Sequence, residues 1–253
     1  MMRALRNTIF AAACALSALA GPCWPVKAMA DVAVDLELVL AVDASGSVDP
    51  DEYALQLGGI AAALRDPDVV AAIGKGPHGR IAVALVVWAD ASRPVDASAW
   101  YVIATAGDAE AAAQAFAAWP RRVVGATGIG AGLAAAMRAM ERNGIRAERQ
   151  VVDVSGDGIE TPPRDIVVLI DTANAMAEAR GVTVNGLAIL NEEPELARWY
   201  RDNVLAGRDA FVMTAAGYED FAVAMKAKLL REIDGLPNLA AACPIATTSR
   251  SER

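Results

Sequence analysis

Short β-branched runs alternate with longer alanine-rich stretches along most of this chain. The alternation is typical of a mainly parallel sheet with helices packed on both faces. Most of the runs are continuously apolar, so we expect strands that are buried on both sides. The predicted strands are Leu36–Val42, Ile81–Trp88, Trp100–Ala104, Gln150–Val154, Val182–Ile189 and Ala210–Met213. The predicted helices are Pro50–Leu64, Asp108–Trp119, Gly128–Asn143, Ile166–Arg180, Glu195–Val204 and Tyr218–Ile233.

These elements predict an α/β fold with three layers and a six-stranded, mainly parallel sheet. The link between Ile81–Trp88 and Trp100–Ala104 is too short for a helix, so this pair is expected to be antiparallel at one sheet edge. The first helix is well marked: Asp49 is expected to cap it, Pro50 suits its first position, and Glu52 suits a capping box.

The first thirty residues have the pattern of a secretory signal peptide. Arg3 and Arg6 give a positive start, Thr8–Ala20 is a short apolar run, and Ala28–Ala30 is a small-x-small cleavage signature. The run is short for a bilayer span, so we expect cleavage before Asp31, no stable membrane insertion, and a periplasmic or secreted protein.

Removal of that segment changes the cysteine count and the charge. Cys14 and Cys23 would be lost, leaving Cys243 without an internal disulfide partner. The remaining chain would carry 20 basic against 31 acidic residues, a net charge of −11. Nucleic acid and anionic membrane are therefore not expected partners. We expect one domain over residues 31–233 and a poorly ordered tail over 234–253.

Polar side chains follow two of the predicted strands. The first strand runs into Asp43-Ala44-Ser45-Gly46-Ser47, and Gln150–Val154 leads to Asp157 between two glycines. Thr127 lies at the start of a predicted helix. Because ligands bind at the carboxyl edge of open α/β sheets, these groups are expected to meet there.

The expected set contains only oxygen ligands, namely the carboxylates of Asp43 and Asp157 and the hydroxyls of Ser45, Ser47 and Thr127. Such a set suits a hard cation such as Mg²⁺ or Mn²⁺ and argues against zinc or copper. The acidic side chain of a protein partner would complete the coordination shell.

Asp43, Ser45 and Ser47 resemble the Asp-x-Ser-x-Ser motif of von Willebrand factor A (VWA) domains, with Thr127 and Asp157 similar to that family's later threonine and aspartate. The resemblance implies a doubly wound, Rossmann-like fold and a metal-ion-dependent adhesion site (MIDAS). It also implies that the serines and the threonine touch the metal directly, while the aspartates often act through water.

The resemblance covers about Val34–Ile233. Asp153–Gly158, Asn185–Leu187 and Tyr200–Val204 are similar to stretches of a bacterial VWA-like family of unknown function. One departure is the loop that contains Glu160, where an amide-rich sequence is expected. We expect Glu160 to be solvated rather than to add charge near the metal.

Each part of this pattern also has a purely structural interpretation. The Asp43–Ser47 stretch alone could be an ordinary turn, and Thr127 alone could cap a helix. Asp153 lies within a strand and is expected to be a hydrogen-bonded structural group. His78 is the single histidine and is expected to lie in a surface turn, so a histidine-based triad is not expected.

The first functional hypothesis is an exported binding module that recognises a protein partner through its metal. Two alternatives stay open: a metal-dependent phosphoester hydrolase at the same edge, and a metal-free interaction scaffold. No phosphate-binding loop or dinucleotide fingerprint occurs in the sequence.

Overall fold

The fold is taken from a computed structural model, which describes residues 31–92, 95–162 and 167–235. The predicted signal peptide with Cys14 and Cys23, and the tail from residue 236 with Cys243, lie outside the described residues. None of the described helices is long and apolar enough to cross a membrane.

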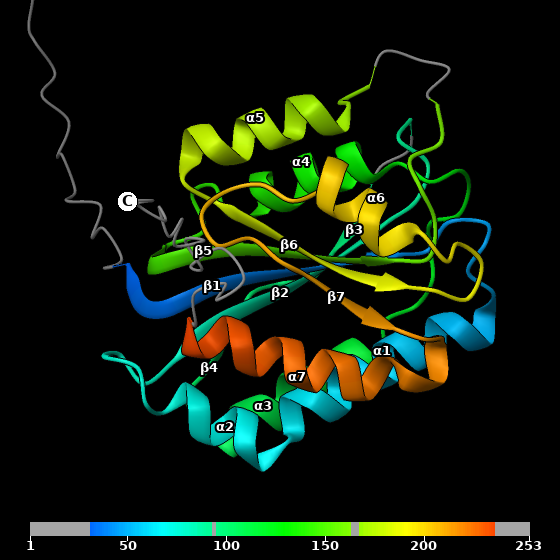
Figure 1. Cartoon of the computed structure of the whole chain (residues 1–253). Helices are drawn as coiled ribbons and strands as arrows, with labels where there is room; N and C mark the ends of the chain where they lie inside the picture. The colour runs from blue at the N-terminus through cyan, green and yellow to red at the C-terminus, as the bar shows by residue number, and fades with distance from the viewer. Residues whose placement is uncertain (1–30, 93–94, 163–166, 236–253) are drawn as a thin grey trace, which may run out of the picture. The chain divides into compact units, whose positions relative to one another are not determined.

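A single mixed sheet forms the centre of the domain (Figure 1). Within the described residues it has seven strands in the order β3-β2-β1-β5-β6-β7, and β4 also pairs with β2. The strands are β1 (Val32–Asp43), β2 (Ile81–Trp88), β3 (Asp96–Ala97), β4 (Tyr101–Ile103), β5 (Ile145–Gly156), β6 (Thr183–Ile189) and β7 (Val212–Ala215). All neighbours are parallel except β3 and β4, which run antiparallel to β2.

The predicted antiparallel edge is therefore confirmed. The seventh strand, β3, was not predicted because two residues are too few to produce an alternating pattern. β1 and β2 are almost entirely buried, as their continuous apolar runs predict.

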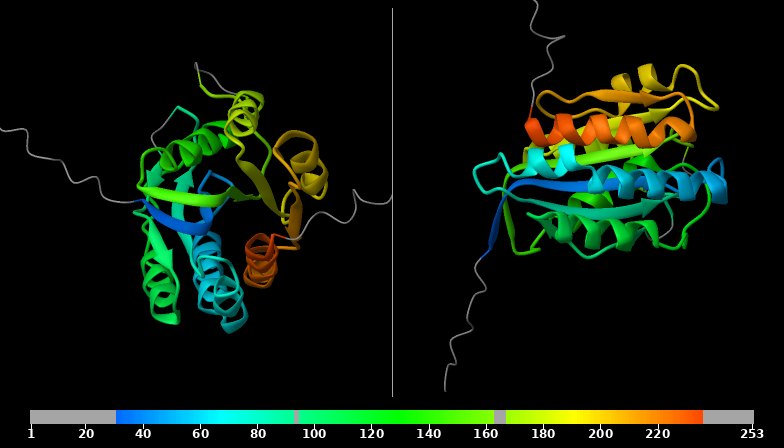
Figure 2. Two further views of the ribbon diagram at one scale, coloured as in Figure 1. Left: turned by 90° about the vertical axis from the view of Figure 1, so that its left-hand side faces the viewer. Right: turned by 90° about the horizontal axis from the view of Figure 1, so that it is seen from below.

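Helices cover both faces of the sheet, which confirms the three-layer α/β class (Figure 2). One face is covered by α1 (Pro50–Arg65), α2 (Pro67–Ile73), α3 (Ala106–Ala117) and α7 (Phe221–Asp234). The other is covered by α4 (Ile129–Ala139), α5 (Ile170–Arg180) and α6 (Leu196–Asn203). Each layer packs an apolar stripe on the sheet, which gives two cores.

Local sequence signals explain where several helices begin. Asp49 accepts backbone hydrogen bonds from Asp51 and Glu52, both at 2.8 Å, and the Glu52 carboxylate accepts from the Asp49 amide. The predicted capping box is confirmed. A 3-10 turn, η1 (Tyr218–Asp220), precedes α7, where the sequence predicts one continuous helix.

Two predicted helix boundaries are wrong. The helix predicted to run to Asn143 ends at Ala139, because Arg142 and Gly144 both have positive φ and turn the chain into β5. The helix predicted from Ile166, which lies outside the described residues, begins at Ile170. Leu169 before it is extended, and its backbone packs so closely on Gly130 of α4 that a Cβ there would approach it to 2.5 Å.

On the surface, Arg65 of α1 donates two hydrogen bonds to Glu110 of α3, at 2.6 and 3.0 Å. This pair lowers the pKa of Glu110 to about 2. Because the folded pKa is below the ordinary value, the pair stabilises the fold above about pH 4.5 and the contribution disappears as the pH falls toward 2. Arg65→Gln should raise the pKa of Glu110 toward its ordinary value without reaching it, because the hydrogen bond from Gln114 remains; NMR titration measures the change. Gln114→Ala, which removes a second hydrogen bond to Glu110, should raise it less.

Candidate metal centre

The stretch Asp43–Ser47 forms a tight loop at the carboxyl end of β1. Asp43 and Ser45 are fully buried there. The Ser45 amide donates to Asp43 Oδ1 at 2.7 Å, which fixes that carboxylate toward its own loop. The Ser45 and Ser47 hydroxyl oxygens lie 3.2 Å apart. Two hydroxyls and a carboxylate therefore share one short segment of chain.

Asp157 joins this segment from the end of β5. Ser47 Oγ donates to Asp157 Oδ1 at 2.7 Å, across 110 residues of sequence. A hydroxyl that donates its proton to a carboxylate keeps its oxygen lone pairs free for a cation. Asp43, Ser45, Ser47 and Asp157 thus lie at one edge of the sheet, as the sequence predicts.

Thr127 reaches the same edge on the loop before α4. The Gly46 amide donates to Gly125 O at 2.7 Å, which ties this loop to the serine loop. The Thr161 amide donates to Thr127 O at 2.9 Å, which ties it to the segment after Asp157. Thr127 Oγ1 would lie 3.6 Å from a Cβ at Gly158. Its hydroxyl makes no hydrogen bond to the other four side chains within the described residues.

One carboxylate oxygen of this set has no hydrogen-bond donor and is therefore open to a cation. Asp43 Oδ2 is fully buried and has no hydrogen-bond partner in the described chain. Burial is the main cause that raises the pKa of Asp43 to about 7. A buried carboxylate oxygen without a donor costs free energy unless a cation or proton reaches it. The residues therefore fit a hard cation.

Side chains behind the loop hold it in place, and no pattern in the sequence predicts them. Arg121 donates to the carbonyl oxygens of Ala44 and Ser45 at 3.0 and 2.8 Å. Gln56 of α1 donates to Asp43 O at 3.1 Å. Because these bonds do not involve the ligand oxygens, they fix the loop without competing with a metal.

Two tyrosines also face the carboxylates. Tyr218 in η1 donates to Asp157 Oδ2 at 3.0 Å. Tyr200 of α6 is fully buried, and its hydroxyl has no hydrogen-bond partner in the described residues. The charge of Asp43 adds to burial in raising the pKa of Tyr200. The position of Tyr218 just after the last strand is a signal that could have placed it at this edge.

The expectation for Glu160 is wrong. Its carboxylate is half-buried and accepts from the Gly130 amide at 3.1 Å, so it lies at the N-terminus of α4. Burial raises its pKa. A helix N-terminus attracts an anion through its free amides and its dipole, which explains why Glu160 leaves the solvent.

Gly156 leaves room for the side chains of Asp43 and Tyr200 to lie against β5 at the site. A Cβ there would lie 2.7 Å from Asp43 Oδ2 and 3.0 Å from the Tyr200 hydroxyl. We expect Gly156→Ala to destabilise the domain by about 1–3 kcal/mol through overpacking, as measured by denaturant unfolding. Gly58→Ala is the matched control, because a Cβ at Gly58 in α1 meets no atom within 4 Å. Equal stability of the two variants would contradict the close approach.

The site depends on hydroxyls as well as carboxylates. The described residues contain no group of three or more His, Cys, Asp or Glu side chains placed to hold a metal.

The fold and the site together define a VWA-type domain. The fold is a mainly parallel sheet with helices on both faces, and the site consists of an Asp-x-Ser-x-Ser loop, a threonine loop and an aspartate at the carboxyl edge of that sheet. More specifically, the chain belongs to the family DUF1194, proteins of unknown function, which matches residues 33–237. A comparison with curated proteins gives no match.

Solved structures with the same fold support this class. Proximal thread matrix protein 1 from the mussel byssus is 19% identical with a TM-score of 0.54, over 81% of this chain and 48% of that chain. The pilus adhesin SpaC from Lactobacillus rhamnosus GG is 14% identical with a TM-score of 0.56, over 81% and 32%. The vWF domain of the pilus tip protein Mfa5 from Porphyromonas gingivalis is 12% identical with a TM-score of 0.52, over 82% and 98%.

This chain therefore spans about half of the mussel protein and a third of the adhesin. A further structure of the mussel protein, 19% identical with a TM-score of 0.54 over 81% of this chain and 47% of that chain, has a zinc-occupied MIDAS motif.

Proposed function

We propose that this protein is a binding module whose divalent cation recognises a protein partner. Asp43, Ser45, Ser47, Thr127 and Asp157 would hold the cation. The proposal rests on one observation: Asp43 Oδ2 is buried and has no hydrogen-bond partner among the described residues. Beside it, hydrogen bonds link the hydroxyls of Ser45 and Ser47 to the Asp157 carboxylate. When bound, the cation would supply an open coordination position for an oxygen ligand of the partner.

The oxygen ligands favour Mg²⁺ or Mn²⁺. Zinc in the mussel relative's MIDAS motif, however, is a reason to include it in any titration. Weaker binding of zinc than of Mg²⁺ or Mn²⁺ would indicate a hard-cation site. Equal binding would indicate a site that also accepts zinc.

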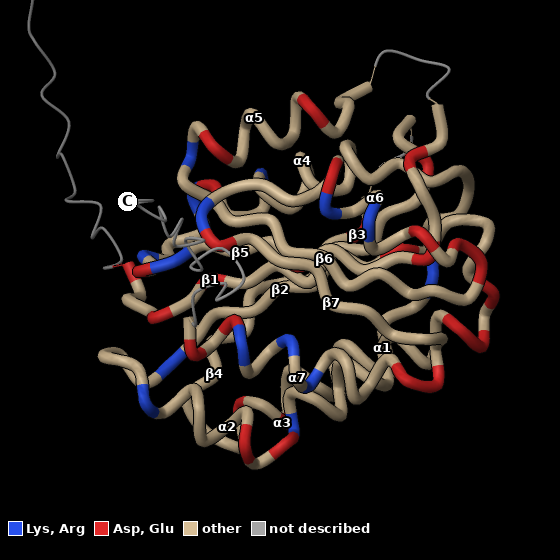
Figure 3. Tube along the Cα trace, viewed as in Figure 1, with Lys and Arg blue, Asp and Glu red and all other residues tan. Residues whose placement is uncertain are grey.

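The charge of the surface around the site restricts which protein partners can bind there. Acidic residues gather on the loops at this edge of the sheet (Figure 3). Asn191 after β6 donates to Glu52 at 3.3 Å, so the acidic segment Glu192–Glu195 lies beside the start of α1. Such a rim repels a generally acidic protein. The fitting partner presents one carboxylate to the metal from a surface that is otherwise basic.

Recognition fits the site better than hydrolysis. His78, the single histidine, lies in the loop before β2, at the opposite end of the strands from Asp43. Two of the similar structures are a pilus adhesin and a pilus tip protein. We also propose export after removal of residues 1–30, which would place the module in the periplasm or outside the cell.

The test is partner capture by the chain from Asp31 onward, run with Mg²⁺, with chelator, and with Asp43→Asn. We expect one or more proteins that are retained only by the parent domain with Mg²⁺, and that are released by raised salt. Retention that is equal in all three arms would support a metal-free scaffold. Turnover of a model phosphoester that disappears in Asp43→Asn would instead support the hydrolase.

A further inference from the structure

The short segment that follows Asp157 leads from the end of β5 directly to the loop that carries Thr127. Thr161, four residues after Asp157, pairs with Thr127 through two hydrogen bonds. The Thr161 amide donates to Thr127 O at 2.9 Å, and Thr161 Oγ1 accepts from the Thr127 amide at 3.2 Å. Both backbone polar groups of Thr127 are therefore held by one residue.

Glu160, the neighbour of Thr161, contacts the same part of the chain slightly further on. Its Oε2 accepts from the amide of Gly130, which lies three residues after Thr127 in the first turn of α4. Two adjacent residues thus bind both the loop that carries Thr127 and the helix that follows it. Because the contacts lie at two successive points, they fix the direction of the chain between them as well as its position.

The start of α4 needs Glu160 because the helix has no cap of its own. Its N-cap residue is Gly128, which makes no side-chain cap, and its first turn contains no acidic residue. The first amides of a helix require acceptors from outside the helix, and a carboxylate there is also favoured by the helix dipole. By contrast, α1 and α3 are capped by their own N-cap residues, Asp49 and Thr105.

Close packing explains why α4 cannot carry an ordinary cap. A Cβ at Gly128 would lie 2.5 Å from Ala91 N and 2.7 Å from Ala89 O, and the Gly128 amide donates to Ala89 O at 2.9 Å. The usual capping residues, serine, threonine, aspartate and asparagine, therefore do not fit at this position. Glu160 supplies the missing acceptor from 30 residues further along the chain.

The Thr127 hydroxyl depends on these backbone contacts more than the other hydroxyls of the site do. Hydrogen bonds link Ser45, Ser47 and Asp157 to one another, whereas within the described residues the Thr127 hydroxyl bonds to none of them. Threonine is β-branched, so its backbone conformation leaves few rotamers open to the hydroxyl. The contacts that fix the backbone of Thr127 therefore also direct its hydroxyl.

From these contacts we propose that Glu160 and Thr161 are positioning residues for the metal centre, because they hold the backbone of Thr127 and the helix start behind it. The inference rests on the proposed function, in which Thr127 is a ligand. It predicts that Glu160, which is not a ligand, alters the affinity for the cation through the position of Thr127 and not through its own charge.

The test is a double-mutant cycle between Glu160→Ala and Thr127→Ala, with Mg²⁺ affinity measured by calorimetry on the folded protein. Glu160→Ala should weaken Mg²⁺ binding about fivefold in the parent chain and have no further effect when Thr127 is already alanine. Glu160→Gln removes the charge but keeps an oxygen that accepts from the Gly130 amide, so it should bind nearly as the parent does. Without any cation, Glu160→Ala should also accelerate hydrogen exchange of the Thr127 amide.

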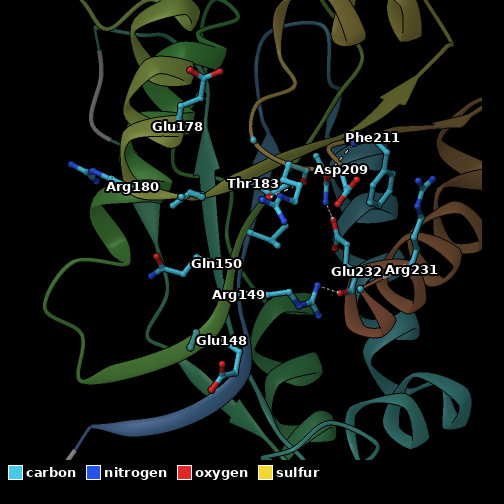
Figure 4. Close-up of a pocket in the computed structure, with 18 residues that line it drawn as sticks. Glu148, Arg149, Gln150, Glu178, Arg180, Thr183, Asp209, Phe211, Arg231 and Glu232 are labelled. Atoms are coloured by element: carbon cyan, nitrogen blue, oxygen red, sulfur yellow. Dashed lines mark hydrogen bonds between the residues drawn. The ribbon is translucent and has the colours of Figure 1, made fainter. Parts of the chain in front are cut away.

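Two controls lie at the opposite edge of the sheet. Thr105→Ala removes the cap of α3, which begins there because β4 before it runs antiparallel to β2. Glu178→Ala removes one carboxylate from the lining of a cavity of about 710 Å³ beside the first half of β5 and the start of β6 (Figure 4). The first control matches the loss of a helix cap and the second the loss of a charge. Both should leave the Mg²⁺ affinity and the exchange of the Thr127 amide unchanged.

Unchanged affinity in Glu160→Ala, or equal weakening with and without the Thr127 side chain, would overturn the inference while the metal site stands. Equal weakening in Glu160→Gln and Glu160→Ala would overturn it as well, because charge would then be the cause. If Glu160→Ala does not fold, Thr161→Val replaces it, since valine removes only the acceptor of the Thr127 amide.

If the parent protein binds no divalent cation, the proposed function fails, and the positioning is judged from hydrogen exchange alone. The same measurement decides where Thr127→Ala binds too weakly for calorimetry. Exchange of the Thr127 amide that is as slow in Glu160→Ala as in the parent would show that Glu160 does not hold this loop.

Discussion

Asp43→Asn is expected to weaken Mg²⁺ binding by roughly a hundredfold or more, because it removes a full negative charge next to a divalent ion. Asparagine is the most informative replacement at this position, because it removes the charge and keeps the shape of the side chain. Its carbonyl oxygen can still accept from the Ser45 amide as Asp43 Oδ1 does, so the loop should keep its conformation. Calorimetric titration with Mg²⁺, Mn²⁺ and zinc measures the affinity of each variant.

The matched control is Asp49→Asn. Asp49 lies six residues further along the chain, and its carboxylate caps α1 through hydrogen bonds to the Asp51 and Glu52 amides. This change should cost at most about 1 kcal/mol of unfolding free energy and leave the cation affinity unchanged. A parent-like affinity in Asp43→Asn would exclude this carboxylate from the metal site, whatever the control shows.

The second large effect is expected at Lys228. Its ammonium group is fully buried between Asp153 and Glu232, and burial is the first cause that raises the pKa of Asp153 above its ordinary value. Lys228→Met leaves two carboxylates in the core without their cation. The loss of unfolding free energy should be about 3–5 kcal/mol, as measured by urea denaturation.

Two further variants separate lost charge pairing from lost packing. Lys228→Met combined with Asp153→Leu and Glu232→Gln contains no buried charge and should recover much of the lost stability. Lys226→Met, two residues earlier on α7, breaks partly exposed ion pairs and should cost less than about 1 kcal/mol. If the triple variant is no more stable than Lys228→Met alone, uncompensated buried charge is not the cause of the lost stability.

The alternating pattern of the sequence was sufficient to predict the layers of the fold, because strands as apolar as Ile81–Trp88 have few alternatives to central burial. It missed α2, although Asp66-Pro67-Asp68 repeats the Asp-Pro-Asp signal that marked α1 at Asp49. In α2 Asp66 accepts from the Asp68 amide, which is the expected cap. The signal was present, and the shortness of the helix concealed it.

For the candidate site, the sequence could supply the five proposed ligand positions, because four of them follow the strands β1 and β5 and Thr127 comes just before α4. It could not supply Arg121, whose bonds to Ala44 and Ser45 span 77 and 76 residues and involve backbone carbonyls that have no sequence signature. Nor could it supply the position of Glu160, since only the structure shows that the N-terminus of α4 is within its reach.

Arg121 and Gln56 donate hydrogen bonds to backbone carbonyls of the loop that carries Asp43, so the backbone conformation of this loop does not depend on a bound ion. If the proposed cation binds at this preformed loop, no folding step has to precede it. The speed of capture is then governed by how quickly the ion sheds its own water. Mg²⁺ dehydrates reluctantly, so it should load more slowly than a less tightly hydrated ion that binds with the same strength.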